Sequence, residues 1–117
     1  MSKRGIGLYV ADIQESISRI EAYTKGLTFE VFRDDKKTID AVVRNLEIIG
    51  EAVKNIPESI QSLHPDIPWR EIMGMRNKIT HEYFGVEEET LWKTVTDDLP
   101  QFKKQIAALT HTYREFE

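Results

Sequence analysis

Apolar residues recur along most of this chain at intervals of three and four, the spacing that places side chains on one face of an α-helix. The first such segment predicts a helix over residues 8–25. Its apolar stripe consists of Val10, Ile13, Ile17 and Ile20. Gly26 follows, and glycine readily adopts the left-handed conformation that ends many helices.

The apolar pattern of residues 36–55 is wider and predicts a central helix, with Asp34 or Asp35 near its start. One stripe is formed by Ile39, Val42, Val43, Leu46, Ile49, Val53 and Ile56, and a second apolar side by Ala41, Ile48 and Ala52. A helix that is apolar on more than one side is central to a fold or shared with another subunit. Gly50 weakens a helix interior by about 1 kcal/mol, so we expect another element to pack closely against it.

Shorter segments connect these long helices. Residues 28–32 predict a connector in which Thr28 caps a single helical turn that buries two phenylalanines. A short helix is expected over residues 57–63 because proline is well suited to the first turn of a helix. The two prolines within residues 65–68 indicate a loop, and not a domain boundary, because neither side could form a core alone.

The second half of the chain carries two more long helical patterns. A helix over residues 68–84 is expected to end at Gly85, with Gly74 permitting a close approach to a neighbouring helix. Beyond three glutamates, apolar residues follow heptad spacing, and Pro100 falls inside this seam, so we expect a kink or break around Asp98. We interpret the seam as bundle core and not as a coiled coil between two copies; its members are Trp92, Val95, Leu99, Phe102, Ile106, Leu109, Tyr113 and Phe116.

These patterns predict an all-α fold, a compact bundle of four to five main helices with short connecting helices. At 117 residues the chain is long enough for one core, so we expect a single domain over residues 1–117. The absence of cysteine excludes disulfides, thiol catalysis and zinc–thiolate sites. We see no signal peptide or membrane span, and we expect a cytoplasmic protein.

A net charge of −4 argues against a broad, non-specific nucleic-acid binder, which would normally be basic. It leaves room for a locally positive cleft on an acidic protein. Arg44, Arg70, Arg76 and Lys78 are the cations that we expect to form such a cleft.

Three residues with complementary chemistry fall within eight positions of the helix predicted over residues 68–84. Arg76 carries a planar cation that fits phosphate, His81 can transfer protons near neutral pH, and Tyr83 offers a hydroxyl. Together they suit attack on a phosphodiester, in which a base takes a proton from a ribose 2′-OH and a cation stabilises the charge on phosphorus. This chemistry needs no metal or cofactor, and no metal-ligand spacing or glycine-rich phosphate loop is present.

Helical geometry limits how these groups can meet. Arg76 and Tyr83 lie seven positions apart and share a face, whereas Arg76 and His81 lie five apart and point about 140° away from each other. Either the arginine wraps round the helix, the helix distorts, or a second copy of the chain supplies the missing group. We favour a homodimer with the site near the subunit interface.

Carboxylates on the helix over residues 36–55 are candidates to support the site. Glu47 and Glu51 form one polar ridge with Arg44, and the simpler interpretation is a pair of ion pairs within that helix. The functional alternative is that one of these carboxylates orients Arg76 or His81. Asn77 is a further candidate for this supporting role.

Two segments resemble the HepT-like toxins, a branch of the HEPN superfamily. They are IPWREIMGMRNKITHEYFGV at residues 67–86 and RNLEIIGEA at residues 44–52, and the resemblance extends from residue 13 to about residue 106. It implies an all-helical dimeric ribonuclease toxin whose partner is a minimal nucleotidyltransferase antitoxin that adds AMP to the motif tyrosine. By position it implies that Arg76 and His81 are catalytic and that Tyr83 is the modified residue.

We therefore predict a metal-independent endoribonuclease toxin of a toxin–antitoxin pair, cleaving RNA through 2′-OH attack and silenced by AMP on Tyr83. RNA is required because DNA lacks that hydroxyl. The alternative is a non-catalytic helical interaction module that binds a nucleotidyltransferase partner. The two differ in whether replacing Arg76 or His81 removes an activity.

Overall fold

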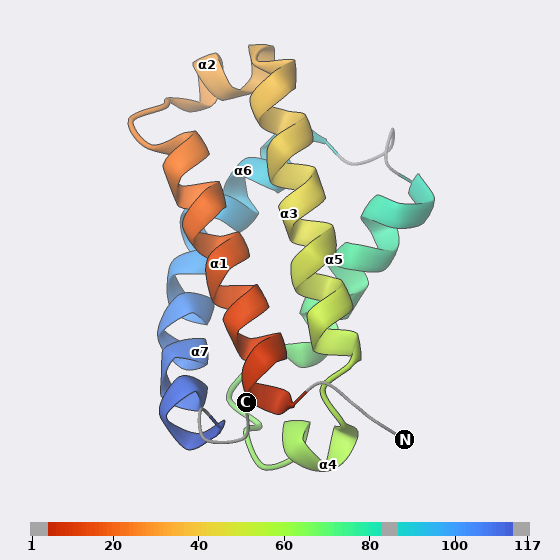
Figure 1. The fold of residues 1–117 in the computed structure, drawn as a ribbon. Coiled ribbons are helices and arrows are strands. Elements are labelled where there is room, and N and C mark those ends of the chain that lie inside the picture. The colour runs from red at the N-terminus through yellow and green to blue at the C-terminus, as the bar shows by residue number, and fades with distance from the viewer. Residues whose placement is uncertain (1–4, 83–86, 114–117) are drawn as a thin grey trace.

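The computed structural model describes residues 5–82 and 87–113, with side chains described for all of these except residues 81 and 82. Within those ranges every regular element is helical and no strand is present, so the all-α prediction is confirmed (Figure 1). The elements are α1 Ile6–Thr24, α2 Phe29–Asp34, α3 Lys36–Lys54, α4 Glu58–Gln61, α5 Trp69–Glu82, α6 Glu88–Lys93, a π-helical turn η2 Thr94–Asp98, and α7 Leu99–Tyr113. Four of these helices are long, as predicted, and three short ones connect them in the described part of the chain.

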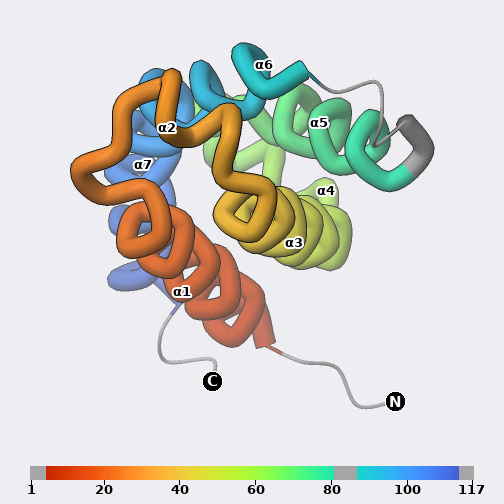
Figure 2. Tube along the Cα trace, turned by 90° about the horizontal axis from the view of Figure 1, so that it is seen from above, coloured from red at the N-terminus to blue at the C-terminus, as the bar shows by residue number. Residues whose placement is uncertain are grey.

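The central element is α3, which packs against α1 on one side and α5 on the other, while α7 packs on α1 (Figure 1, Figure 2). This arrangement follows from the two apolar sides of α3, because each side needs a partner that removes it from water. The stripe predicted for α1 is buried, and so is the whole main stripe predicted for α3, including Ile56 just after the helix. The core residues within these two helices are Val10, Ile13, Ile17, Ile20, Ile39, Val42, Val43, Leu46, Ile49, Ala52 and Val53.

The connector predicted after α1 is the short helix α2. Thr28 caps it, since its Oγ1 accepts a hydrogen bond from the Val31 N–H at 3.3 Å. Phe32 is completely buried and its ring lies 5.0 Å from that of Trp92, whereas Phe29 is only half-buried. Before α2, Gly26 adopts a φ of +77°, which confirms the left-handed residue expected after the first helix.

The break expected near Pro100 takes the form of the π-helical turn Thr94–Asp98. Pro100 lies at the start of α7, where its missing N–H and its ring are tolerated. The turn is closed by the Leu99 N–H, which donates to the Thr94 carbonyl. Six members of the predicted heptad seam are buried within the chain, as the bundle-core interpretation requires: Val95, Leu99, Phe102, Ile106, Leu109 and Tyr113. Trp92 is half-buried, and Phe116 lies outside the described residues.

The segment after α4 is held by side-chain hydrogen bonds. Trp69 Nε1 donates to the carbonyl oxygens of Gln61 and His64 at 3.1 and 3.0 Å. His64 Nε2 lies 3.0 Å from the Tyr113 hydroxyl, which ties this loop to the end of α7. The short helix itself spans only Glu58–Gln61, fewer residues than the pattern predicted. No helix in the described ranges has both the length and the apolar character to span a bilayer.

The N-terminus of α3 generates a prediction about pH. The Asp35 carboxylate accepts hydrogen bonds from the Thr38 hydroxyl at 2.7 Å and from the Thr38 backbone N–H at 3.0 Å, and these bonds hold the pKa of Asp35 below its ordinary value. A lowered folded-state pKa stabilises the fold above the unfolded-state pKa, and this stabilisation is lost as pH falls through the folded-state pKa. The difference in melting temperature between wild type and Asp35→Ala should therefore shrink between pH 7 and about pH 2.

Asp35→Asn is the matched control, because a neutral amide oxygen can still cap a helix. The difference in melting temperature between Asp35→Asn and Asp35→Ala should stay nearly constant with pH, as measured in thermal melts followed by circular dichroism. A difference between wild type and Asp35→Ala that is equally large at both ends of the pH range would contradict the assignment.

Candidate functional site

The contact that places Arg76 is a close approach of α5 to α3 at Gly50. A methyl group at position 50 would overlap Arg76 Cβ and Cγ, so the arginine stem occupies space that only glycine leaves open. The close packing expected at Gly50 is thus confirmed, with Arg76 as its partner. The similar expectation for Gly74 is wrong within this chain, because no described atom other than those of its chain neighbours and its own helix backbone lies within 4 Å of where its Cβ would be.

The guanidinium of Arg76 is held at the surface of α3. Its NH2 group donates to Glu51 Oε1 at 2.7 Å, and its NH1 group donates to Asn77 Oδ1 at 3.0 Å. The arginine side chain is only 20% exposed, whereas Glu51 is 52% exposed, so the stem is packed and the ion pair sits at its rim. These two bonds engage two of the five guanidinium N–H donors, and an incoming anion can accept from others.

Arg76 lies at the edge of a polar hollow of about 380 Å³. Helices α1, α3 and α5 contribute its lining, which consists of Tyr9, Asp12, Arg44, Glu47, Ile48, Glu51, Ala52, Asn55, Arg76 and Thr80. Two arginines and three carboxylates face one another there. An anion that enters meets fixed positive groups, but it must compete with carboxylates that already surround them.

The structure distinguishes the two carboxylates of the α3 ridge. Glu51 reaches across to Arg76 on α5, while Glu47 lines the hollow without a hydrogen bond to Arg76.

Only two of the four basic residues expected to form a cationic cleft lie together. Arg44 and Arg76 line the hollow, but Arg70 and Lys78 are exposed on other faces of α5, because steps of 100° along the helix carry them away from it.

The other two members of the motif are less fully placed. His81 belongs to the last described turn of α5, and its side chain lies outside the described residues, as does all of Tyr83. Helix α5 is α-helical from Trp69 to Glu82, so no local distortion brings positions 76 and 81 onto one face. Two of the three ways to bring the arginine and the histidine together remain: the Arg76 side chain wraps round the helix, or a second copy of the chain supplies the missing group. Among the described side chains, no group of three metal-ligating residues is found.

Comparison with known proteins follows this geometry. The family model described as "Ribonuclease HepT-like" matches residues 13–109, which include all of α3 and α5 and the residues that these two helices contribute to the polar hollow. The chain belongs to the ribonuclease HepT-like family. The resemblance inferred from the sequence motifs is therefore confirmed, and the family is one of ribonucleases.

Relatives of this ribonuclease HepT-like chain cover nearly all of its length. The probable ribonuclease HepT of Thermococcus cleftensis is 52% identical over 107 residues, which are 92% of this chain and 97% of that protein. Two proteins of Methanocaldococcus jannaschii that are named as RNases are 45% identical over 105 residues and 40% identical over 115 residues. These alignments cover 90% and 98% of this chain and 87% and 99% of the relatives. No solved structure matches the chain significantly.

The sequence did not predict that α1 lines part of the polar hollow. Tyr9 and Asp12 line it from α1, and Asn55 lines it from the end of α3. The only signal was their position off the apolar stripe of α1, which they share with ordinary solvated residues. The pairing of Gly50 with Arg76 was equally hidden, because spacing along one helix does not reveal which residue faces it.

The Gly50 contact predicts a large effect of one methyl group. Gly50→Ala should lower the free energy of unfolding by about 1–3 kcal/mol, since the added carbon forces α3 and α5 apart. Gly74→Ala adds the same methyl group at an open helical position and should instead raise stability by up to about 1 kcal/mol. Urea denaturation of both variants tests this pair. Equal effects would contradict the packing role of Gly50.

Proposed function

We propose that this chain is the metal-independent endoribonuclease toxin of a toxin–antitoxin pair, with Arg76 and His81 as its catalytic residues. The observation that carries the proposal is the placement of Arg76, which is packed over Gly50 and held by Glu51 at the edge of a polar hollow. An arginine fixed in this way can meet a phosphate without first being ordered. Membership of a ribonuclease family makes RNA the substrate class.

In this proposal Arg76 binds the scissile phosphate and stabilises the charge that builds on it. Its planar fork matches two phosphate oxygens, and charge-assisted hydrogen bonds of this kind are stronger than neutral ones. Glu51 and Asn77 each accept one N–H of the same guanidinium, which orients the fork. Glu51 thus acts as a positioning residue, and the entering phosphate takes the remaining donors.

His81 performs the proton transfers. The 2′-OH loses its proton to an imidazole, a bond forms between O2′ and phosphorus, and the bond from phosphorus to the 5′-oxygen breaks. The departing oxygen takes a proton, leaving a 2′,3′-cyclic phosphate and a 5′-OH end. Position 81 lies in the last described turn of α5, and the protonated form of its imidazole supplies the proton that the departing oxygen takes.

A second copy of the chain completes the site in this proposal. The backbone of α5 directs positions 76 and 81 about 140° apart, and the Arg76 side chain lies across α3. A homodimer whose copies meet beside the hollow brings His81 of each subunit towards Arg76 of the partner. Half-buried Ile48, which lines the hollow, supplies apolar surface for that contact.

Tyr83 is the regulatory residue of the proposal. AMP added to its hydroxyl by a minimal nucleotidyltransferase antitoxin would place bulk and a negative phosphate two positions after His81. RNA phosphates would then be repelled from the site. The cytoplasm is the compartment in which such a pair would act.

One observation favours the second candidate, a non-catalytic module that binds a nucleotidyltransferase partner. The lining of the hollow carries three carboxylates, Asp12, Glu47 and Glu51, against two arginines. Arg76 is already engaged by one of them. A surface of mixed charge suits protein recognition as well as RNA binding.

The decisive prediction concerns cleavage of total RNA in the presence of a metal chelator. Arg76→Ala should slow cleavage about 100–1,000-fold, because it removes a group that stabilises the transition state. His81→Ala should slow it about 100–10,000-fold through lost proton transfer. Arg70→Ala is the matched control, since it removes an exposed cation of the same helix outside the hollow. Circular dichroism verifies that each variant is folded.

The state of Tyr83 must be known for this assay. Mass spectrometry first establishes that the wild type carries no AMP, and an adenylylated sample is then expected to be silent. Unmodified, folded wild type that leaves RNA intact would move the assignment to the interaction module. Cleavage by the adenylylated sample at the normal rate would refute the regulatory part alone.

The ion pair of Glu51 generates a separate prediction. Glu51→Gln should lower kcat by about 10–100-fold with little change in fold, because misplacing a catalytic group by a small distance is costly. Glu47→Gln removes a carboxylate of the same hollow that does not bond to Arg76, and it should cost much less. Faster cleavage by Glu51→Gln would mean that Glu51 restrains Arg76 and does not position it.

A further inference from the structure

A second and larger hollow lies on the opposite side of α3 from Arg76. Its volume is about 520 Å³, and it shares no lining residue with the polar hollow. We call it the acidic groove; its lining consists of Leu46, Ile49, Asp66, Pro68, Glu71, Ile72, Met75, Thr94, Asp97, Asp98, Leu99, Gln101, Phe102 and Gln105. Neither the ribonuclease chemistry nor its proposed regulation uses this surface.

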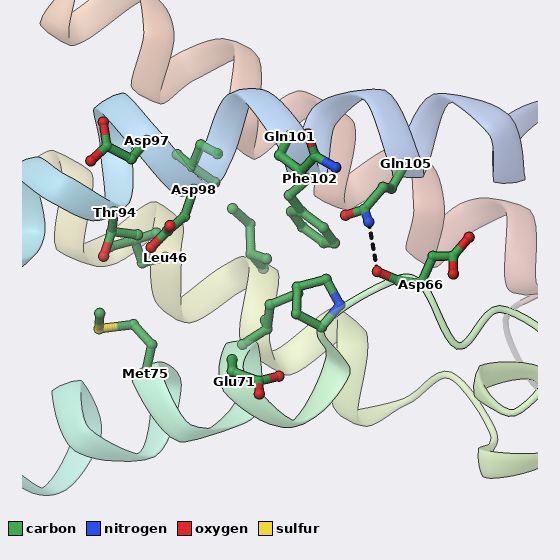
Figure 3. A pocket seen from close by; sticks show the side chains of 14 residues that line it. Leu46, Asp66, Glu71, Met75, Thr94, Asp97, Asp98, Gln101, Phe102 and Gln105 are labelled. Carbon is green, nitrogen blue, oxygen red and sulfur yellow. Dashed lines mark hydrogen bonds between the residues drawn. The ribbon is translucent and has the colours of Figure 1, made fainter.

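The acidic groove has the shape of a trough between two helices. Helix α5 forms one wall, while η2 and α7 form the other, and α3 supplies the floor with Leu46 and Ile49 (Figure 3). Pro68, which directly precedes α5, and the α5 residues Glu71, Ile72 and Met75 fall at spacings of three, one and three, which is one face of the helix over two turns. At one end, Gln105 Nε2 donates to the Asp66 carbonyl at 2.6 Å and links the two sides.

The charged side chains of this lining are all acidic. Asp66, Glu71, Asp97 and Asp98 stand around an apolar floor, and no lysine, arginine or histidine belongs to the lining. Lys93 lies 3.8 Å from Asp98 near the rim, and both side chains are more than 60% exposed, so this pair is weak. Exposed Lys78 follows Glu71 and Met75 at helical spacing on α5, one turn beyond the lining. The groove is therefore apolar at its base, and the charged residues of its lining are all acidic.

The wall formed by η2 adds a second feature. This π-helical turn presents Asp97 and Asp98, two neighbours in sequence, to the same groove. Such turns occur frequently at functional sites. At the other end of the groove, Gln105 Oε1 is buried and finds no hydrogen-bond donor among the described residues (Figure 3).

We infer that the acidic groove docks a basic amphipathic helical segment of a partner protein. An amphipathic helix lays its apolar residues into a trough of this kind, and its lysines and arginines then meet the carboxylates of the rim. Met75 suits such a contact because its flexible side chain adapts to the residues it meets. The inference stands on the groove alone and does not depend on ribonuclease activity.

Two other occupants are disfavoured by charge. RNA phosphates would be repelled by the carboxylates, which also separates this surface from the catalytic one. A second copy of the chain, docked groove to groove about a twofold axis, would bring two acidic rims together. A basic partner relieves the like-charge repulsion of the rim.

Methionine methyl groups offer a local test of occupancy. We would label the methionine methyl groups with ¹³C and titrate the protein with an acetylated peptide of about 14 residues, long enough to form helix on binding. Its leucines follow helical i, i+3, i+4, i+7 spacing and its other residues are lysines. The Met75 signal should shift, whereas that of Met73, which belongs to the same helix but not to the groove lining, should not.

Charge reversal at the rim should weaken this binding. Asp97→Lys with Asp98→Lys is expected to raise Kd at least about tenfold, as measured by fluorescence anisotropy. Glu30→Lys with Asp34→Lys makes the same change of net charge on α2, outside the groove, and should have a much smaller effect. Glu71→Lys on the opposite wall repeats the test should the first pair fail to fold. Arg76→Ala should leave peptide binding unchanged.

Four results would overturn the inference. The Met75 signal could stay fixed at millimolar peptide, or a peptide of the same composition with scattered leucines could bind equally well. A shift of Met75 that grows with protein concentration alone would identify a second copy as the occupant. A shift caused by an RNA oligonucleotide would identify nucleic acid.

Discussion

The close approach of α3 and α5 at Gly50 is the constraint on which the rest of this structure depends. Because position 50 has no side chain, the stem of Arg76 can lie directly on the backbone of α3. That contact brings the guanidinium to Glu51 and sets the arginine at the edge of the polar hollow. It also holds α5 on α3 along the line that becomes one wall of the acidic groove.

Helix α3 separates two different electrostatic environments. On one side, arginines and carboxylates face each other across the polar hollow, so an anion there exchanges one charged partner for another. On the other side, carboxylates stand above an apolar floor with no cation in the lining. The two surfaces share no lining residue, although the same helix, α3, contributes to both.

The sequence predicted the long helices well because each carries an apolar stripe whose period is a property of the helix alone. Features that depend on what lies opposite were harder. Gly50 and Gly74 are both helical glycines, yet only Gly50 faces another helix, and spacing could not tell them apart. Pro100 predicted a break in the helix. The sequence did not predict that the break would be a π-helical turn, because such a turn is defined by which carbonyl the Leu99 N–H bonds to, here that of Thr94. Arg70 and Lys78 were grouped with Arg76 by proximity in sequence, whereas direction around the helix decides which cations share a surface.

The packing of α1 against α7 has a consequence for synthesis of the protein. Translation releases α1 first and α7 last among the described helices, so α1 can pack on α3 early, whereas its contact with α7 forms only after most of the chain has been made. Contacts so distant in sequence close slowly because a long loop must be ordered first. A nascent chain therefore holds the complete Arg76 segment while its core is still open. The core can therefore be completed only after α7, the last of the described helices, has been made.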